Sequence, residues 1–242
     1  MTVARGKAKY CVVDDGIEYP ISDGRPMADN TRQFQWIVTI QGGIDALFKD
    51  DPNIFVAGDL LWYPRKGNTK IRRAPDAMVA FGRPKGHRGA YLQWVEGGIA
   101  PQVVFEVLSP KNTAAEMAGK QQFYDTYGVE EYYEYDPDDG RLTGWRRVGG
   151  RLQVIAQIEG WVSPRLGVRF GLRGRDLLLE NPDGTPFLSY VEQARRREAA
   201  EAQLSAERER AEAERERAEA ERERAARLAE RLRALGIDPE TV

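Results

Sequence analysis

The chain has 242 residues, of which 41% are hydrophobic and 31% charged, enough for one ordinary domain with an appendage. Its 36 Lys and Arg are balanced by 38 Asp and Glu, so bulk basicity does not indicate a nucleic-acid or membrane partner. One cysteine and one histidine exclude a disulfide framework and argue against a cysteine or histidine metal centre. The sequence has no apolar run of about 20 residues and no secretory signal, which predicts a cytoplasmic protein without a membrane partner.

The first half of the chain predicts one helix followed by three strands. The helix begins after Asn30, because Gln33 completes a capping-box pattern and apolar residues then recur at helical spacing. Strands are predicted over 54–63 and 75–81 and, after a long polar connection, over 102–108.

The next segments predict a helix, a strand and a hairpin. The helix has its own capping box, Thr113 with Glu116, and a stop at Gly128. A strand over 130–136 and a hairpin over 142–158 follow. This order predicts an α/β fold with a mixed central sheet flanked by helices, in which the hairpin extends one edge of the sheet.

The last part of the chain has a different composition. Residues 189–242 contain 12 Arg, no Lys and 14 Asp or Glu, whereas residues 1–188 carry 24 charges of each sign. The heptad AERERAE occupies 206–212 and again 213–219, which predicts a long charged helix as a second domain. The best coiled-coil register places Ala opposite Glu and buries little, so a solvated helix and a weak coiled coil that makes a homodimer or holds a partner both stay open.

Two carboxylates stand where apolar residues are expected. Glu106 interrupts a strand that is apolar on both faces, so a buried Glu106 must meet a cation or a hydrogen-bond donor. Asp76 follows Pro75 at the start of another apolar strand. Two carboxylates that enter one sheet on neighbouring strands offer hard oxygen ligands to Mg²⁺ or Mn²⁺. The alternatives are a structural ion pair for Glu106 and an ordinary strand-initiating role for Asp76.

A lysine lies on the apolar face of the second predicted helix. Lys120 is at the centre of a face that also carries Met117, Tyr124 and Tyr127. It either extends outward between the aromatic rings or points its ammonium toward the sheet. Because this helix follows the strand of Glu106, the inward orientation predicts a cation beside that carboxylate.

These residues, in this order, resemble the PD-(D/E)xK nuclease superfamily and more closely the Uma-two family of restriction-endonuclease-like proteins. The matching stretches are APDAMVAFGRPKG at 74–86, PQVVFEVLSPKN at 101–112, K-x-x-x-Y-x-x-YGVEEYYEYDPDDGRLTGW at 120–145 and GWVSPRLGVRF at 160–170. The resemblance implies a restriction-endonuclease-like core in which Asp76 and Glu106 bind Mg²⁺ or Mn²⁺ and a lysine assists.

The sequence departs from the superfamily pattern at one core position. Leu108 stands where a lysine is usual, two residues after the glutamate. Lys120 matches the replacement that the family resemblance implies, and Lys111 is a weaker substitute. Gln33 and Gln35 stand where the first helix of such families often carries a histidine, which leaves the role of that helix open.

Together these residues predict a metal-dependent DNA endonuclease that hydrolyses phosphodiester bonds. Asp76, Glu106 and the carbonyl of Val107 would hold the metal, and Lys120 would orient water or oppose the charge on the phosphate. DNA would be held through its phosphates by cations that flank Asp76. The predicted nucleic-acid-binding residues are Arg72, Arg73, Arg83 and Lys85.

Other interpretations stay open. The flanking cations could belong to solvated loops, Asp59 is either an accessory acid or a bulge residue, and Tyr91 and Trp94 either stack on bases or anchor their loop. The alternative function is a catalytically inactive protein of this fold that binds or assembles partners through its C-terminal helix. The missing lysine at Leu108 and the neutral charge balance favour that alternative.

Overall fold

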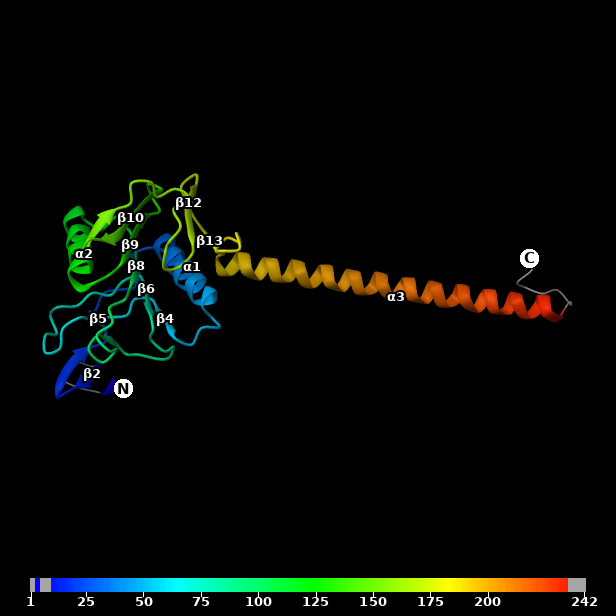
Figure 1. Ribbon diagram of the computed structural model, residues 1–242, viewed down its shortest axis with the longest axis horizontal. Helices are drawn as coiled ribbons and strands as arrows, with labels where there is room; N and C mark the ends of the chain where they lie inside the picture. Colours follow the sequence, from blue (N-terminus) through cyan, green and yellow to red (C-terminus); the bar gives the residue numbers. More distant parts are fainter. Residues whose placement is uncertain (1–2, 5–9, 235–242) are drawn as a thin grey trace. The chain divides into compact units, whose positions relative to one another are not determined.

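The structure, a computed structural model, describes residues 3–4 and 10–234. The chain divides into two compact units, Met1–Ser189 and Tyr190–Val242. Within the described residues, the first unit contains a six-stranded sheet, three smaller sheets and two helices, and the second contains the helix α3 (Tyr190–Ala234) (Figure 1). The predicted α/β class, with a mixed sheet, flanking helices and a long C-terminal helix, is the observed one.

The central sheet has the strand order β11-β10-β9-β8-β6-β4. Its strands are β4 (Ile54–Ala57), β6 (Ala77–Phe81), β8 (Val103–Val107), β9 (Glu131–Asp136), β10 (Arg141–Val148) and β11 (Arg151–Val154). Strands β8 and β9 pair in parallel, and the other neighbours pair antiparallel. The parallel pair needs a crossover connection, which α2 (Ala114–Tyr127) supplies, and the predicted hairpin forms one edge of the sheet as β10 and β11.

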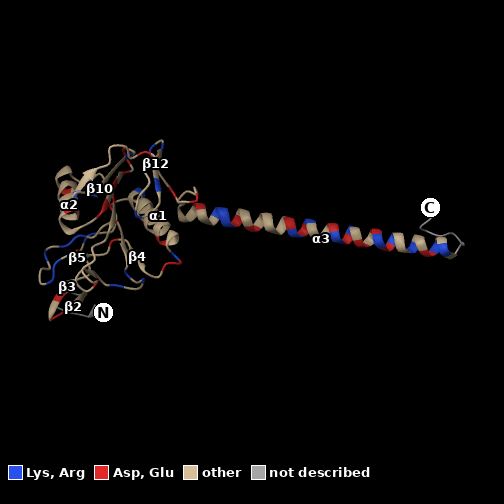
Figure 2. Cartoon of the chain, in the orientation of Figure 1, with Lys and Arg blue, Asp and Glu red and all other residues tan. Residues whose placement is uncertain are grey.

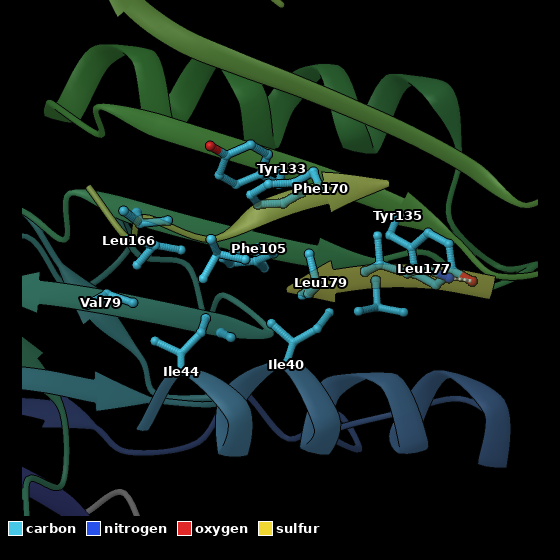
Figure 3. Close-up of a cluster of buried hydrophobic side chains, with 14 of the residues drawn as sticks. Ile40, Ile44, Val79, Phe105, Tyr133, Tyr135, Leu166, Phe170, Leu177 and Leu179 are labelled. Carbon is cyan, nitrogen blue, oxygen red and sulfur yellow. Dashed lines mark hydrogen bonds between the residues drawn. The ribbon is translucent and has the colours of Figure 1, made fainter. Parts of the chain in front are cut away.

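The helices α1 (Thr31–Leu47) and α2 cover opposite faces of this sheet. Phe105 of β8 packs in one core cluster with Ile44 of α1, whereas Val104 packs in a second cluster with Tyr124 of α2. Figure 3 shows the first cluster, in which Phe105 and neighbouring strand residues face α1. Because side chains alternate along a strand, Glu106 lies on the α2 face.

Both helices begin at the predicted caps. The Asn30 side chain accepts a hydrogen bond from the backbone N–H of Gln33, and the Thr113 side chain accepts one from that of Glu116. Gly128 ends α2 in the left-handed conformation with a φ of 94°. Glycine adopts this conformation with little conformational strain because it has no Cβ. The local sequence signals therefore place both helix starts and the end of α2.

The strand predicted over 54–63 is wrong in one respect, because the chain turns in its middle. Asp59 has a φ of 48°, and the ladder is interrupted between β4 and the short strand β5 (Trp62–Tyr63). Strand β5 pairs in parallel with β7 (Tyr91–Leu92) outside the central sheet. The hairpin is also shorter than predicted, since β11 ends at Val154.

Two further small sheets complete the first unit. One has the order β1-β2-β3, and the other pairs β12 with β13. Their strands are β1 (Val3–Ala4), β2 (Cys11–Asp14), β3 (Ile17–Pro20), β12 (Arg169–Arg173) and β13 (Asp176–Glu180). Leu166, Phe170, Leu177 and Leu179 join the core cluster on the α1 face.

The helix α3 has 45 residues, none of them buried. Figure 2 shows basic and acidic residues alternating along its whole length. Leu204 and Leu228, which belong to the predicted apolar seam, are 49% and 64% exposed. The solvated helix and the weak coiled coil therefore both stay predictions; the seam residue Leu235 lies outside the described residues. No helix within the described part of the chain combines the length and apolar character needed to cross a bilayer.

Candidate active site

Asp76 and Glu106 meet across two neighbouring strands. Ala77 of β6 is opposite Phe105 of β8 in an antiparallel ladder, so continuing the register by one residue places Asp76 opposite Glu106. Directly opposite residues in such a ladder have Cβ atoms about 4.5–5.5 Å apart. Asp76 Oδ2 also accepts a hydrogen bond of 2.7 Å from the backbone N–H of Val107. The sheet therefore brings together two carboxylates that are 30 positions apart in the sequence.

Glu106 is held by two side chains of α2. Its side chain is 1% exposed, and its Oε2 atom lies 2.7 Å from the ammonium of Lys120. The hydroxyl of Tyr124 donates to the other oxygen, Oε1. Lys120 has the inward orientation that its place on the helix predicts. This ion pair is also what the structural interpretation of Glu106 requires, so the pair alone does not decide between the two roles.

The charges in this cluster shift one another's proton affinity. Burial, and then the negative charge of Glu106, raise the pKa of Asp76 well above its usual value, although Lys120 and the Val107 N–H oppose this. Burial lowers the pKa of Lys120, but attraction to Glu106 and Asp76 outweighs burial and raises it. Burial and the charge of Glu106 raise the pKa of Tyr124 well above its usual value. Lys120 is therefore a cation, Tyr124 is a neutral donor, and one lysine does not fully compensate two carboxylates.

The sequence did not predict the contribution of Gln33. Its amide Nε2 donates to the carbonyl of Val107 at 2.7 Å, and its Oε1 accepts from the backbone N–H of Asp29 at 2.7 Å. Gln33 thus links the backbone of Asp29 to the backbone of Val107, whose N–H in turn binds Asp76. The Val107 carbonyl, predicted as a metal ligand, already accepts one hydrogen bond and has one lone pair left. The sequence signals at Gln33 were its capping pattern and its place where the first helix of such families often carries a histidine, and neither indicates a contact across 74 residues.

Asp76, Lys120 and Gln33 line a pocket of about 940 Å³. Its walls come from the irregular segment 23–29, the segment 70–74 and the first half of α2. Asp59, the candidate accessory acid, lines the same pocket. Asp76 and Lys120 of the predicted trio therefore line a space that a substrate can enter, whereas the buried Glu106 does not line it and reaches it only through its contact with Lys120.

Acidic residues neutralise two of the cations in this pocket. Arg25 lies 3.5 Å from Glu116, and Lys111 lies 2.7 Å from Asp29. Lys111, the weaker substitute for the missing lysine, is thus bound to a different carboxylate. Glu106 is paired with Lys120 instead, which supports Lys120 as the assisting lysine.

Three other cations of the pocket form no ion pair with a carboxylate in the described part of the chain. They are Lys70, Arg72 and Arg73, which follow one another on a single wall. Arg72 and Arg73 donate to the backbone carbonyls of Thr69 and Arg72, and the Arg73 guanidinium lies 5.3 Å from the ring centre of Phe123. These cations can meet a phosphate without first breaking an ion pair.

The other two predicted nucleic-acid-binding residues are elsewhere. Arg83 is bound to Glu96 at 3.0 Å with a side chain only 23% exposed, and Lys85 is bound to Asp45 at 2.9 Å. Neither lines the pocket of Asp76. Proximity in sequence to Asp76 did not translate into proximity in space, because the chain passes through β6 before reaching them.

Of the two roles that the sequence allowed for Tyr91 and Trp94, base stacking and loop anchoring, the structure shows loop anchoring. Tyr91 is fully buried and its hydroxyl donates to the carbonyl of Ile99. The indole N–H of Trp94 donates to Asp14 at 2.9 Å. Both rings are therefore committed to the fold rather than presented to a nucleic acid.

The donor set suits a hard divalent cation. Two carboxylates and a peptide carbonyl are oxygen donors of the kind that such a cation prefers, and the carboxylates carry more negative charge than Lys120 offsets. Among the residues that the structure describes, no three His, Cys, Asp or Glu side chains form a metal-binding cluster. A cation held here would take its remaining ligands from water, as Mg²⁺ usually does.

No curated protein matches the chain. A solved structure, a crystal structure titled as a “putative nuclease belonging to DUF820” from Anabaena variabilis ATCC 29413, is 16% identical over 62% of this chain and 78% of that one, with a TM-score of 0.43. A family model described as “Putative restriction endonuclease” matches residues 10–178, which include Asp76, Glu106 and Lys120. The chain therefore belongs to the Uma2 family, as its motifs indicated.

Proposed function

We propose that this protein is a metal-dependent DNA endonuclease that hydrolyses phosphodiester bonds with Asp76, Glu106 and Lys120. The observation that carries the proposal is the convergence of these three groups at the edge of a pocket. One wall of that pocket carries Lys70, Arg72 and Arg73, which form no ion pair with a carboxylate of the described residues. Membership in a family described as a restriction endonuclease supports the same reaction class.

In this proposal the carboxylates of Asp76 and Glu106 and the carbonyl of Val107 hold a Mg²⁺ or Mn²⁺ ion. Such an ion, when bound, neutralises charge on the phosphate and makes water a better nucleophile at neutral pH. The backbone N–H of Val107 donates to Asp76, and Gln33 holds the backbone carbonyl of the same residue. These contacts make the donor set rigid before substrate arrives.

Lys120 has two tasks. Its ammonium holds Glu106 from the side of α2, and it reaches the pocket, where it can orient water or oppose the charge that develops on phosphate oxygens. Its raised pKa, caused by the two carboxylates, keeps it protonated, so it acts as a cation and donor and not as a base.

Lys70, Arg72 and Arg73 would hold the DNA backbone. Each of them lines the pocket without a carboxylate partner among the described residues, whereas Arg83 and Lys85 are bound to Glu96 and Asp45. Contacts to phosphates position DNA without reading its sequence. The proposal therefore assigns binding to the first three and leaves Arg83 and Lys85 out.

Mg²⁺-dependent nicking of supercoiled plasmid tests the proposal. Asp76→Asn keeps an oxygen for the Val107 N–H and removes the charge, so we expect nicking to fall by more than about 100-fold, since loss of an outer-shell partner alone costs roughly 10–100-fold. Asp45→Asn, which breaks the exposed ion pair with Lys85, is the control and should nick like the wild type. Nicking that survives Asp76→Asn, or that needs no divalent ion, would remove this site from the reaction.

One alternative has its own supporting observations. Both oxygens of Glu106 are bound to α2 residues, and Leu108 replaces the usual lysine, as in a fold kept without catalysis. The helix α3, which has no buried residue, would then recruit or assemble a partner. This alternative predicts no nicking by the wild type with any divalent ion, together with retention of a partner by α3 fused to a carrier.

A further inference from the structure

We propose that Tyr124 is a positioning residue that, together with Lys120, fixes Glu106 in the orientation required to bind a divalent cation. This inference rests on the proposed function, since it assigns a task within the same site. Nothing in the motif itself distinguishes Tyr124 from an ordinary core tyrosine. Its assignment comes from which atoms its hydroxyl reaches.

Lys120 and Tyr124 grip the two oxygens of one carboxylate from a single helix. They are four residues apart, so they lie on the same face of α2, one turn apart. The ammonium is bound to Oε2 and the hydroxyl to Oε1 of Glu106. With a donor on each oxygen, rotation of the carboxylate breaks at least one strong hydrogen bond. The lone pairs not used by these donors then have a fixed direction.

The tyrosine itself has no freedom to move. Its side chain is fully buried, with the ring stacked parallel to Trp62 at a centroid distance of 6.4 Å and packed against Tyr132 at 4.9 Å. At the end of α2, Arg147 donates to the carbonyl of Asp125 at 2.7 Å and so ties the helix to β10. The hydroxyl therefore stays where the fold places it.

A hydrogen bond to a metal-binding carboxylate affects the metal as well as the fold. Partners that orient metal ligands commonly change metal affinity or activity by about 10–100-fold when they are removed. Glu106 without the Tyr124 hydroxyl would keep Lys120 alone, and its carboxylate could turn about that single contact. Tyr124→Phe removes one oxygen atom and leaves the ring packing unchanged, which makes it the sharpest test.

The experiment measures binding of Mn²⁺ alone to the full-length protein by electron paramagnetic resonance of the free ion, and plasmid nicking against Mn²⁺ concentration. We expect Tyr124→Phe to weaken Mn²⁺ binding about 10–100-fold, to raise the Mn²⁺ concentration for half-maximal nicking by a similar factor, and to leave the KM for DNA unchanged. The control is Tyr91→Phe, which removes the hydroxyl of another buried tyrosine, one that donates to the Ile99 carbonyl away from the pocket. It should bind Mn²⁺ like the wild type.

The outcomes separate this inference from the function beneath it. Wild-type affinity for Mn²⁺ in Tyr124→Phe, or an equal loss in Tyr91→Phe, would show that Tyr124 only packs the core, while the proposed nuclease stands. A wild-type protein that neither binds Mn²⁺ nor nicks DNA would overturn the proposed function, and the role of Tyr124 with it. Weakened binding confined to Tyr124→Phe supports the positioning role.

Discussion

Removing Lys120 from its buried ion pair with Glu106 should destabilise the protein far more than removing a lysine from an ion pair on the surface. Lys120→Met leaves Glu106, with a side chain 1% exposed, next to Asp76 without its positive partner. Breaking a buried ion pair on one side costs about 3–5 kcal/mol, because an uncompensated charge stays behind. Tyr124 still donates to Glu106 after this change. We therefore expect Lys120→Met to lower the free energy of unfolding by about 3 kcal/mol, the lower end of that range.

The assay is urea denaturation followed by tryptophan fluorescence, with a double-mutant cycle. Glu106→Gln combined with Lys120→Met keeps an oxygen for Tyr124 and removes both charges, so most of the lost stability should return. Lys49→Met, which breaks an ion pair whose two side chains are 69% and 87% exposed, should cost less than about 1 kcal/mol. A cost below about 1 kcal/mol for Lys120→Met, or a double variant no more stable than Lys120→Met, would refute the view that Lys120 compensates a buried charge.

Two further predictions concern the body of the protein and its helical extension. Gly140→Ala should cost about 2–4 kcal/mol, because a φ of 64° is strained for alanine and the new Cβ would lie 2.7 Å from the Arg175 Cα. At Gly149 the φ is 58° and a new Cβ would meet open space, so Gly149→Ala should lower the free energy of unfolding by only about 1–2 kcal/mol in urea denaturation. Equal losses of stability at the two glycines would contradict the clash at Gly140. Deleting the chain after Ser189 should leave the urea midpoint and any nicking activity unchanged, because no residue of α3 is buried. A lower midpoint or an insoluble product would show that the first unit needs α3.

Local pattern was sufficient for most of the elements and for one side-chain orientation. Asn30 and Thr113 cap helices where the sequence indicated. The sequence predicted a buried ion pair, because Glu106 lies in an apolar strand and Lys120 on an apolar helix face. In the structure Lys120 Nζ lies 2.7 Å from Glu106 Oε2. These predictions succeeded because periodicity specifies which face a residue occupies, and because a buried charge is stable only when it is paired with an opposite charge.

The same periodicity placed the ring of Tyr124 but did not assign a role to its hydroxyl. It is one helical turn from Lys120 on the face that was already identified as apolar. Its size and chemistry indicated a core residue, and the sequence carries no sign that its hydroxyl reaches Glu106. Burial in the core accounts for the place of the Tyr124 ring, whereas only the position of β8 accounts for the hydrogen bond of its hydroxyl to Glu106.

The amino-acid sequence by itself determined the fold class, the helix caps, the Glu106–Lys120 pair and, through its motifs, the family. The other contacts of the site residues were decided by the tertiary structure alone. The ladder between β6 and β8 sets Asp76 opposite Glu106, and Gln33 reaches Val107 from the other side of the sheet. Arg83, near Asp76 in the chain, is bound to Glu96 instead. The reason is physical: spacing along a strand or helix fixes direction, but strand register and helix packing bring distant residues into contact, and these depend on the whole core.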